Sequence, residues 1–255
     1  MARYLPRMLW PLLAFALWAG PTAAAEIRVV TVGALRMALE PIATQYQTGA
    51  GNTLAVTYTN PANIAQTLAE GSFDVIIAAT SSVQERAAAG AIAAATRIRL
   101  ARTGIGISIR EGAPKPDLSS PEAFRNAVLA ARNVVYTNPE TPNGSGILTR
   151  ALLEEAGLLE AVLAKGMMSG LAAGRDLIAA GEYEMGFFNI SEAISPGVVL
   201  AGPVPDPYQR YTDYDAAVMQ GVADAAAAAS FIDHVARAEM RAAWAEGGIE
   251  LTAEP

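Results

Sequence analysis

The chain has 255 residues, of which 52% are hydrophobic, and it carries a formal net charge of −7 and no cysteine. This composition excludes a disulfide framework and a thiolate metal site, and the acidic balance without any basic run argues against a nucleic-acid-binding protein. An anionic ligand would have to be attracted locally, because the field of the whole protein opposes it.

The N-terminal residues 1–25 have the layout of a secretory signal peptide. Arg3 and Arg7 give the first residues a positive charge, and the apolar stretch LWPLLAFALWAG follows them. The small residues Ala23 and Ala25 close the segment, as at a cleavage site. This stretch is shorter than the roughly 20 apolar residues that a membrane-spanning helix needs. We therefore expect cleavage after Ala25 rather than a membrane anchor, and a periplasmic protein with no stable membrane insertion afterwards.

Strand-like and helix-like runs alternate along the rest of the chain. The strand-like runs are 27–32, 54–59, 74–79, 104–109, 133–137, 183–189 and 213–219. The helix-like runs are 35–47, 64–69, 83–89, 122–130, 146–156, 172–180 and 223–245. Such alternation predicts an α/β protein made of βαβ units with parallel, doubly wound sheets.

Two segments rich in proline and glycine, 110–122 and 201–215, interrupt this alternation. We interpret them as lying at or near crossings between two lobes. The predicted domains are lobe one, 26–106 plus 211–255, and lobe two, 107–210, joined by a two-strand hinge with a cleft between them. The alternative is a single sheet with long loops.

Polar or glycine-containing turns follow five of the predicted strands. In open α/β sheets, ligands bind beyond the carboxyl ends of the strands. The turns also look like helix starts, which present unpaired N–H groups and about half a positive charge, so several at one cleft would bind an anion without many cations. A purely structural capping role is the alternative for any single turn. The candidate ligand-binding residues are Gly33, Ala34, Leu35, Arg36, Asn60, Asn63, Thr80, Ser81, Asn138, Asn143, Ser145 and Asn189.

Two arginines are candidates for direct contact with a ligand. Arg36 lies in the first turn of a predicted helix, where a cation opposes the helix dipole, so it is suspected of binding a carboxylate with both nitrogens. The alternative is a surface pair with Glu40, four residues on. For Arg175, a place at the cleft and a place at the surface both stay open.

The sequence carries no signature of a hydrolase or a metal enzyme. It has no GxSxG elbow and no cluster of His, Asp and Glu with metal-ligand spacing. The single histidine, His234, lies in a helical pattern far from the strand ends and is assigned a structural or surface role. We therefore expect no metal and no cofactor, and the catalytic residues, if there are any, are unknown.

Several stretches resemble the periplasmic molybdate-binding type of solute-binding protein, within the type II binding-protein fold. They are VVTVGALRMALEPIATQYQTGAGNTLAVTYTN, IAQTLAEGSFDVIIAA, YTNPETPNGSGILTRALLEEAGL, GEYEMGFFNISEA and FIDHVARAEMRAAWAEGGIE. The pattern QxLxxGxxDVxI, which begins at Gln66, is quite specific to that family. The resemblance implies a two-lobed fold, a ligand in the cleft, hinge closure and an ABC-type permease as a possible partner. A monomer is also expected.

The chain departs from the family pattern at the expected ligand site. The family's serines after the first and second strands are replaced by Gly33–Leu35 and by 60–63, and its tyrosine is replaced near Asn189. A larger organic di- or tricarboxylate is therefore expected rather than molybdate.

The alternative is an enzyme of the aconitate isomerase branch. Such an enzyme interconverts cis- and trans-aconitate by an allylic proton shift and needs one acid or base. Tyr58, Tyr136 and Glu140 are weak candidates for that role.

Overall fold

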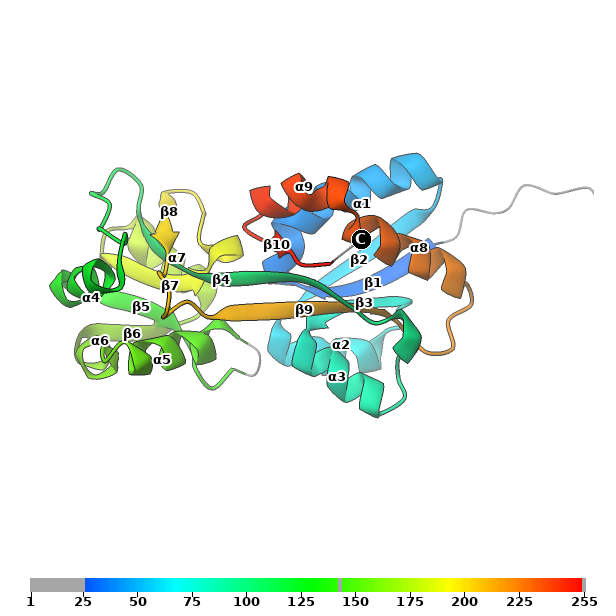
Figure 1. The fold of residues 1–255 in the computed structure, drawn as a ribbon, viewed down its shortest axis with the longest axis horizontal. Helices are drawn as coiled ribbons and strands as arrows, with labels where there is room; N and C mark the ends of the chain where they lie inside the picture. The colour runs from blue at the N-terminus through cyan, green and yellow to red at the C-terminus, as the bar shows by residue number, and fades with distance from the viewer. Residues whose placement is uncertain (1–25, 142–143, 254–255) are drawn as a thin grey trace, which may run out of the picture.

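The computed structural model describes residues 26–141 and 144–253, which fold into two lobes lying side by side (Figure 1). The expected signal peptide, 1–25, lies outside the described residues. Within the two described stretches, no helix has both the length and the apolar character that crossing a membrane requires.

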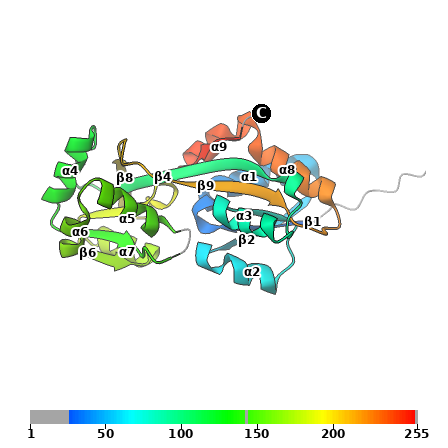
Figure 2. The same ribbon diagram turned by 60° about the horizontal axis from the view of Figure 1, so that its bottom comes forward.

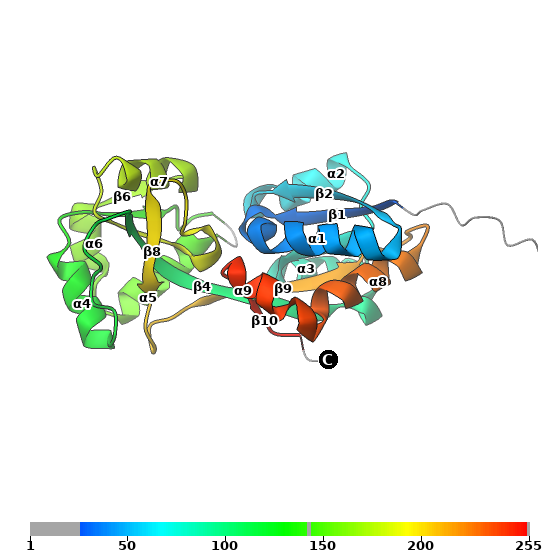
Figure 3. The same ribbon diagram turned by 90° about the horizontal axis from the view of Figure 1, so that it is seen from above.

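Lobe one is built on the strand order β2–β1–β3–β9. β1 (Glu26–Val32), β2 (Thr53–Thr59) and β3 (Val75–Ala79) are parallel, and β9 (Tyr211–Val218) pairs antiparallel with β3. One face of the sheet is covered by α1 (Arg36–Ala50), α8 (Ala225–Ala236) and α9 (Arg241–Glu246) (Figure 3). The other is covered by α2 (Ile64–Glu70) and α3 (Thr80–Ala88) (Figure 2). All five residues of β3 are buried because both faces are covered.

Lobe two is built on the strand order β6–β5–β7–β4. β5 (Val134–Thr137), β6 (Gly166–Ser169) and β7 (Met185–Asn189) are parallel, and β4 (Ile98–Arg110) is antiparallel to β7 and to β8 (Val198–Pro203). A core that includes Phe124, Leu152 and Phe187 joins the sheet to α4 (Pro121–Ala130), α5 (Ser145–Glu155) and α6 (Leu159–Lys165). α7 (Leu171–Ala179) packs through Ile178 in a separate, smaller cluster.

Two long strands, β4 and β9, connect the lobes (Figure 1). β4 pairs with β9 from Ile98 to Gly104, and from Ile105 onwards it pairs with β7 and β8 instead. The buried Gln209 side chain secures this point, because its Oε1 accepts from the Ile105 N–H at 2.8 Å and its Nε2 donates to the Ile105 carbonyl at 3.0 Å. Residue 104 is glycine because a Cβ there would lie 2.9 Å from the Gln209 side chain.

The two-lobed α/β fold with a two-strand hinge is therefore confirmed. The change of strand partners at Ile105 and the start of β9 at Tyr211 mark where the lobes meet. We keep the exact boundaries, 26–106 plus 211–255 and 107–210, as a proposal.

The structure differs from the sequence prediction in several elements. The sheets are mixed rather than parallel, because β4 and β9 cross between the lobes in opposite directions. β4 begins at Ile98 rather than at residue 104. The elements absent from the prediction are β6, β8, α6 and β10 (Glu250–Leu251). They are short, and periodicity is weakest for short segments.

The single helix expected over 223–245 is two helices. α8 ends at Ala236, and the chain reverses through Arg237 before α9 begins. The buried Trp244 of α9 donates its indole N–H to the Val235 carbonyl at 2.8 Å. This bond satisfies a carbonyl at the open end of α8, so α9 folds back on α8 instead of extending it.

Candidate anion-binding site

The carboxyl ends of strands from both lobes meet at one interlobe pocket of about 610 Å³. It is lined by Gly33, Ala34, Asn60, Pro61, Ala62, Asn63 and Tyr214 from lobe one, and by Thr137, Asn138, Thr141, Gly144, Ser145, Met168, Ser169, Gly170, Leu171, Asn189 and Glu192 from lobe two. Of the twelve predicted residues, seven lie in this lining: Gly33, Ala34, Asn60, Asn63, Asn138, Ser145 and Asn189. Asn143 lies outside the described residues.

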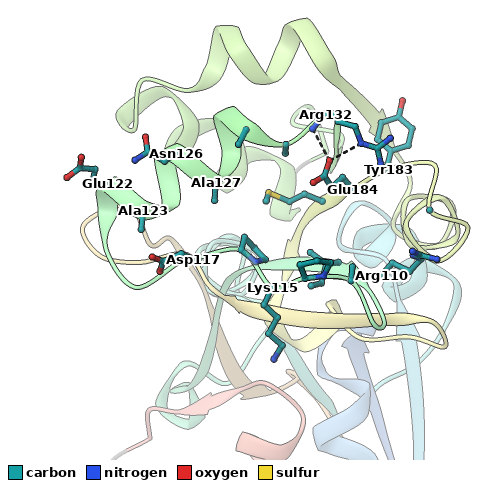
Figure 4. A pocket seen from close by; sticks show the side chains of 18 of the residues that line it. Arg110, Lys115, Asp117, Glu122, Ala123, Asn126, Ala127, Arg132, Tyr183 and Glu184 are labelled. Atoms are coloured by element: carbon teal, nitrogen blue, oxygen red, sulfur yellow. Dashed lines mark hydrogen bonds and ion pairs between the residues drawn. The ribbon is translucent and has the colours of Figure 1, made fainter.

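A larger cavity of about 820 Å³ lies on lobe two, beside α4 (Figure 4). Its charged side chains include both signs, and the Arg132 guanidinium is already bonded to Glu184 at 3.2 Å. The start of α4 reaches this cavity, but Ser120 caps it by accepting from the Ala123 N–H at 3.1 Å. The negative charge of Glu122 also lies in this first helical turn. The anion-binding features predicted from the sequence therefore point to the interlobe pocket instead.

Lobe one offers two short 3₁₀ turns to the interlobe pocket. Gly33–Leu35 follows β1, and Pro61–Asn63 follows β2. Val32 and Asn60, which precede these turns, make no side-chain capping hydrogen bond to any described residue. Asn60 has the backbone geometry of an N-cap, extended and followed by proline, but its side chain stays exposed. The N–H groups that begin both turns are therefore left without a side-chain acceptor.

Lobe two offers the start of α5, immediately beyond β5. The helix begins at Ser145 and has no side-chain cap among the described residues. The Ser145 and Thr137 hydroxyls lie 2.9 Å apart and share a hydrogen bond. Residue 146 must be glycine, because a Cβ there would lie 2.3 Å from the Asn138 carbonyl oxygen. Glycine thus lets the helix start directly against the strand end.

A second helix start in lobe two belongs to a predicted helix, but its place at the ligand pocket was not predicted. α7 begins at Leu171, directly after β6 and Gly170, and no described side chain caps it. The sequence KGMMSG, Lys165 to Gly170, held a weak signal, because a short apolar run bounded by glycines can be a strand that ends in a turn. The strand is only four residues long, which explains why alternation did not reveal it.

No described residue that lines the interlobe pocket is a lysine or an arginine. The ionisable side chains there are Glu192 and Tyr214, and neither was predicted. Glu192 belongs to the 3₁₀ turn Ile190–Glu192 after β7, three residues beyond the predicted Asn189. Tyr214 comes from β9, so only the tertiary fold brings it here.

The Glu192 carboxyl is in contact with the predicted residue Asn189. Its Oε2 accepts from the Asn189 Nδ2 at 2.8 Å. Burial raises the pKa of the Glu192 carboxyl, although the Asn189 hydrogen bond and the charge of Arg175 act in the opposite direction. Asn189 is only 6% exposed, and its Oδ1 is buried with no hydrogen-bond partner among the described residues. Burial and the Glu192 charge also raise the pKa of Tyr214, which is therefore neutral.

Arg175, whose place the sequence left open, lies on α7 next to Glu192. Its guanidinium donates to the Glu192 backbone carbonyl at 3.1 Å. Its Nε is buried and has no partner within the described chain. Arg175 is not part of the pocket lining, so it stands beside the turn that carries Glu192 and acts on that carboxyl through space.

The structure corrects the placement of four predicted residues. Leu35 is fully buried in the core of lobe one. Arg36 is bonded to Glu40 at 3.0 Å, and its guanidinium lies 3.9 Å from the centre of the Tyr58 ring. Both contacts favour the cation despite the helix dipole, so Arg36 matches the surface-pair alternative.

The other two residues, Thr80 and Ser81, line a smaller cavity of about 220 Å³, which also lies between the lobes and shares Gly144 with the interlobe pocket. Thr80 donates to Asp215 at 2.6 Å, because the neighbouring strand β9 places this carboxylate opposite the start of α3. α3 begins at Thr80, and the residue before it, Ala79, has no side chain that could cap the helix.

The weak candidates for an acid or base are absent from the pocket lining. Burial raises the pKa of Tyr58 to about 12, and Glu140 lies 3.8 Å from Arg150 at the surface. His234 packs beside Tyr46 in lobe one, with ring centres 5.2 Å apart, and burial lowers its pKa. In the described part of the chain, no group of three or more His, Asp and Glu residues could hold a metal ion.

Comparisons with known proteins agree with this architecture. The sequence model of the family "bacterial extracellular solute-binding protein" matches residues 27–250. The aconitate isomerase of a Pseudomonas species is 29% identical over 185 residues, which are 71% of this chain and 69% of that protein. The periplasmic molybdate-binding protein of Azotobacter vinelandii superposes with a TM-score of 0.69 at 18% identity, over 88% of this chain and 98% of that one. The sulfate-binding protein SubI of Mycobacterium tuberculosis has a TM-score of 0.69 at 15% identity, over 89% and 87%.

Proposed function

Because the chain belongs to the family of bacterial extracellular solute-binding proteins, we propose that its interlobe pocket holds a small organic anion with two or three carboxylate groups. The observation that carries this proposal is the convergence of uncapped backbone turns and helix starts from both lobes on a pocket whose described lining has no cation. An anion is the ligand that such N–H groups bind.

The two walls of the pocket supply donors in different ways. Lobe two supplies the N-termini of α5 and α7, helices of 11 and 9 residues, each with about half a positive charge from its macrodipole. Lobe one supplies the two 3₁₀ turns, Gly33–Leu35 and Pro61–Asn63. Donors on opposite walls suit a ligand that carries anionic groups at both ends.

Three features of the pocket and one relative favour an organic polycarboxylate over a tetrahedral oxyanion. The pocket volume of about 610 Å³ falls within the range of small-molecule sites, which is roughly 300–1,000 Å³. The lining includes apolar side chains such as Leu171 and Met168, of which Met168 is 54% exposed. Gly33, Ala34 and Ala62 offer no side-chain hydroxyl to an oxyanion. A relative is named for its action on aconitate, a tricarboxylate.

The biological setting is also part of the proposal. Family membership supports export, and we propose that the mature protein works in the periplasm after loss of residues 1–25. There it would deliver its ligand to an ABC permease. The lobes would close about the hinge formed by β4 and β9 and so enclose the anion.

Thermal shift measurements test the proposed ligand class. Purified mature protein is heated with trans-aconitate, citrate, molybdate or sulfate. We expect the carboxylates to stabilise it, by about 2.7 kcal/mol at a concentration of one hundred times the dissociation constant. Arg132→Ala, in the larger cavity beside α4, is the matched control and should keep the full shift. Stabilisation by molybdate or sulfate but by neither carboxylate would contradict the proposal.

A second candidate function is aconitate isomerisation. Two observations favour it: the 29% identity to an aconitate isomerase and the Glu192 carboxyl in the pocket, whose pKa burial raises. A raised pKa suits a general acid or base that works near neutral pH. For this function Glu192 would have to be ionised in the complex: its carboxylate would take a proton from the methylene carbon, the double bond would shift, and the proton would return at the other end of the allylic system.

Chromatography of trans-aconitate after incubation with the protein separates the two functions. Formation of cis-aconitate that Glu192→Gln abolishes would establish the enzyme. Binding of trans-aconitate without any product would leave the protein as a binding protein alone.

A further inference from the structure

Two side chains of the pocket, Glu192 and Asn189, form a pair whose hydrogen bonding does not suit an anion. In the observed arrangement the Asn189 Nδ2 is used on the Glu192 carboxylate at 2.8 Å. The amide oxygen of Asn189, an acceptor, is left buried with no partner in the described chain. An ionised carboxylate is also only an acceptor. The Glu192 carboxylate therefore has no hydrogen to donate to an anionic ligand as it stands, and one of the two Nδ2 hydrogens of Asn189 is committed to it.

The charges in the pocket also show that an ionised Glu192 does not suit an anionic ligand. A ligand carboxylate next to an ionised Glu192 would place two negative charges in a site whose described lining has no lysine or arginine. When two carboxylates share a site, the pKa of one of them rises strongly, because two negative charges at close range repel each other. Burial already raises the pKa of Glu192 in the free protein, so a bound anion acts in the same direction.

The charged and titratable groups around Glu192 come from three other elements. Arg175 of α7 favours the ionised carboxyl, as does the Asn189 hydrogen bond from β7. Tyr214 of β9 is neutral. Arg175 is occupied with the Glu192 backbone carbonyl and does not line the pocket. In the free protein, burial therefore favours the neutral form of the Glu192 carboxyl, and the nearby Arg175 favours the ionised form. A bound anion adds to the effect of burial.

We propose that Glu192 is a neutral acid when the anion is bound, so that one proton enters the pocket with the ligand and the Asn189 amide turns to accept from Glu192 and release both of its Nδ2 hydrogens. This inference rests on the proposed function of the pocket. A neutral Glu192 can donate its O–H to the amide oxygen that now lacks a partner. Half a turn of the Asn189 amide, whose two ends have nearly the same shape, then brings its oxygen to the Glu192 O–H and frees both Nδ2 hydrogens from the carboxyl. Glu192 is in this way a residue that determines specificity.

The coupling predicts how affinity depends on pH. Taking up one proton with the ligand lowers the affinity up to tenfold for each pH unit above the titration of free Glu192, by linkage. Glu192→Gln has the same shape, is always neutral, and can donate to the same amide oxygen. This variant should bind trans-aconitate as well as the wild type does at low pH, and its advantage over the wild type should grow by up to tenfold for each pH unit above the titration of Glu192.

Isothermal titration calorimetry with trans-aconitate tests the inference. Wild type and Glu192→Gln are titrated between about pH 5.5 and about pH 8.5, in two buffers of different ionisation enthalpy. The difference in proton uptake between the two proteins belongs to Glu192, because the ligand's own titration is common to both. We expect wild type to take up as much as one extra proton. Equal proton uptake and parallel pH profiles would overturn the inference.

The result separates this inference from the function on which it rests. If trans-aconitate binds wild type with no proton uptake beyond that of the ligand itself, the inference fails while the binding function stands. Absence of binding by trans-aconitate and citrate at every pH would overturn the function, and the inference with it. The wild-type measurement in two buffers decides the matter even if the variant does not fold.

Discussion

The two lobes share one strand topology but differ in the contacts that their side chains make. The sheet order β2–β1–β3–β9–β4–β7–β5–β6 reads alike from both ends, so β1, β2 and β3 correspond to β5, β6 and β7. At the amino ends of corresponding strands an arginine bonds a carboxylate through both its backbone N–H and its guanidinium. The pair is Arg28–Asp74 in lobe one and Arg132–Glu184 in lobe two.

The difference between the lobes lies in burial and in whether a 3₁₀ turn precedes the α-helix after each strand. The acid side chain is 10% exposed at Asp74 but 45% exposed at Glu184. At the pocket, lobe one ends its strands in short 3₁₀ turns, whereas lobe two begins α5 and α7 there. The same topology can therefore carry a buried ion pair in one lobe and an exposed one in the other, and it can meet the pocket with 3₁₀ turns in lobe one and with α-helix starts in lobe two.

The largest expected effects come from the separate cores of the lobes. Phe187→Ala in β7 and Ile77→Ala in β3 remove fully buried side chains from different clusters. We expect about 3–5 kcal/mol of destabilisation for the first and about 2–5 kcal/mol for the second. Hydrogen exchange should show the loss of protection mainly in the lobe that carries the substitution. Equal loss in both lobes would show that they unfold as one unit.

A smaller effect separates the two arginine–carboxylate pairs. Asp74→Asn should lower the free energy of unfolding by about 1–3 kcal/mol, because a buried, charge-assisted bond is lost. Glu184→Gln, the matched control at the exposed pair, should cost less than about 1 kcal/mol. Urea denaturation measures both. Equal costs would mean that burial does not distinguish the lobes at these positions.

The same pair predicts a pH dependence. The Arg28 hydrogen bond lowers the pKa of Asp74 in the folded protein. A carboxyl with a lowered pKa contributes stability above its unfolded value of about 3.9, and this contribution is lost as the pH falls through the folded value. The difference between wild type and Asp74→Asn should therefore be full at pH 7 and shrink below about pH 4. A difference that grows on acidification would contradict this.

The smallest expected effect compares one glycine from each wall of the pocket. Gly146→Ala would place a Cβ 2.3 Å from the Asn138 carbonyl and displace the start of α5, whereas a Cβ at Gly33 would meet nothing within 4 Å. We expect the first to weaken binding of trans-aconitate more than about tenfold, since a hydrogen bond to a charged group is lost. The second should change binding less than about twofold. Equal effects would show that α5 has no special role.

Several pocket positions could be predicted because their signals are local. Gly33, Asn60, Ser145 and Asn189 each lie close to a strand end, and the structure brings all four to one pocket. Arg36 and Thr80 lie just as close to strand ends. Arg36, however, contacts Tyr58 and Glu40, and Thr80 donates a hydrogen bond to Asp215. A sequence pattern shows that a side chain stands near a strand end, but it does not show which neighbour will engage it.

The sequence by itself determined the alternation of strands and helices, the two-lobed class and the strand ends at which an anion could meet backbone donors, because these depend on periodicity and on residues close together in the chain. Only the tertiary structure decided that β4 and β9 cross antiparallel and that Tyr214 lines the same pocket as Asn189 and Glu192. Only the tertiary structure, likewise, surrounded that carboxyl with a described lining that has no cation. The physical reason is that burial and Coulomb interactions depend on distances between segments far apart in the sequence, and no local pattern encodes those distances.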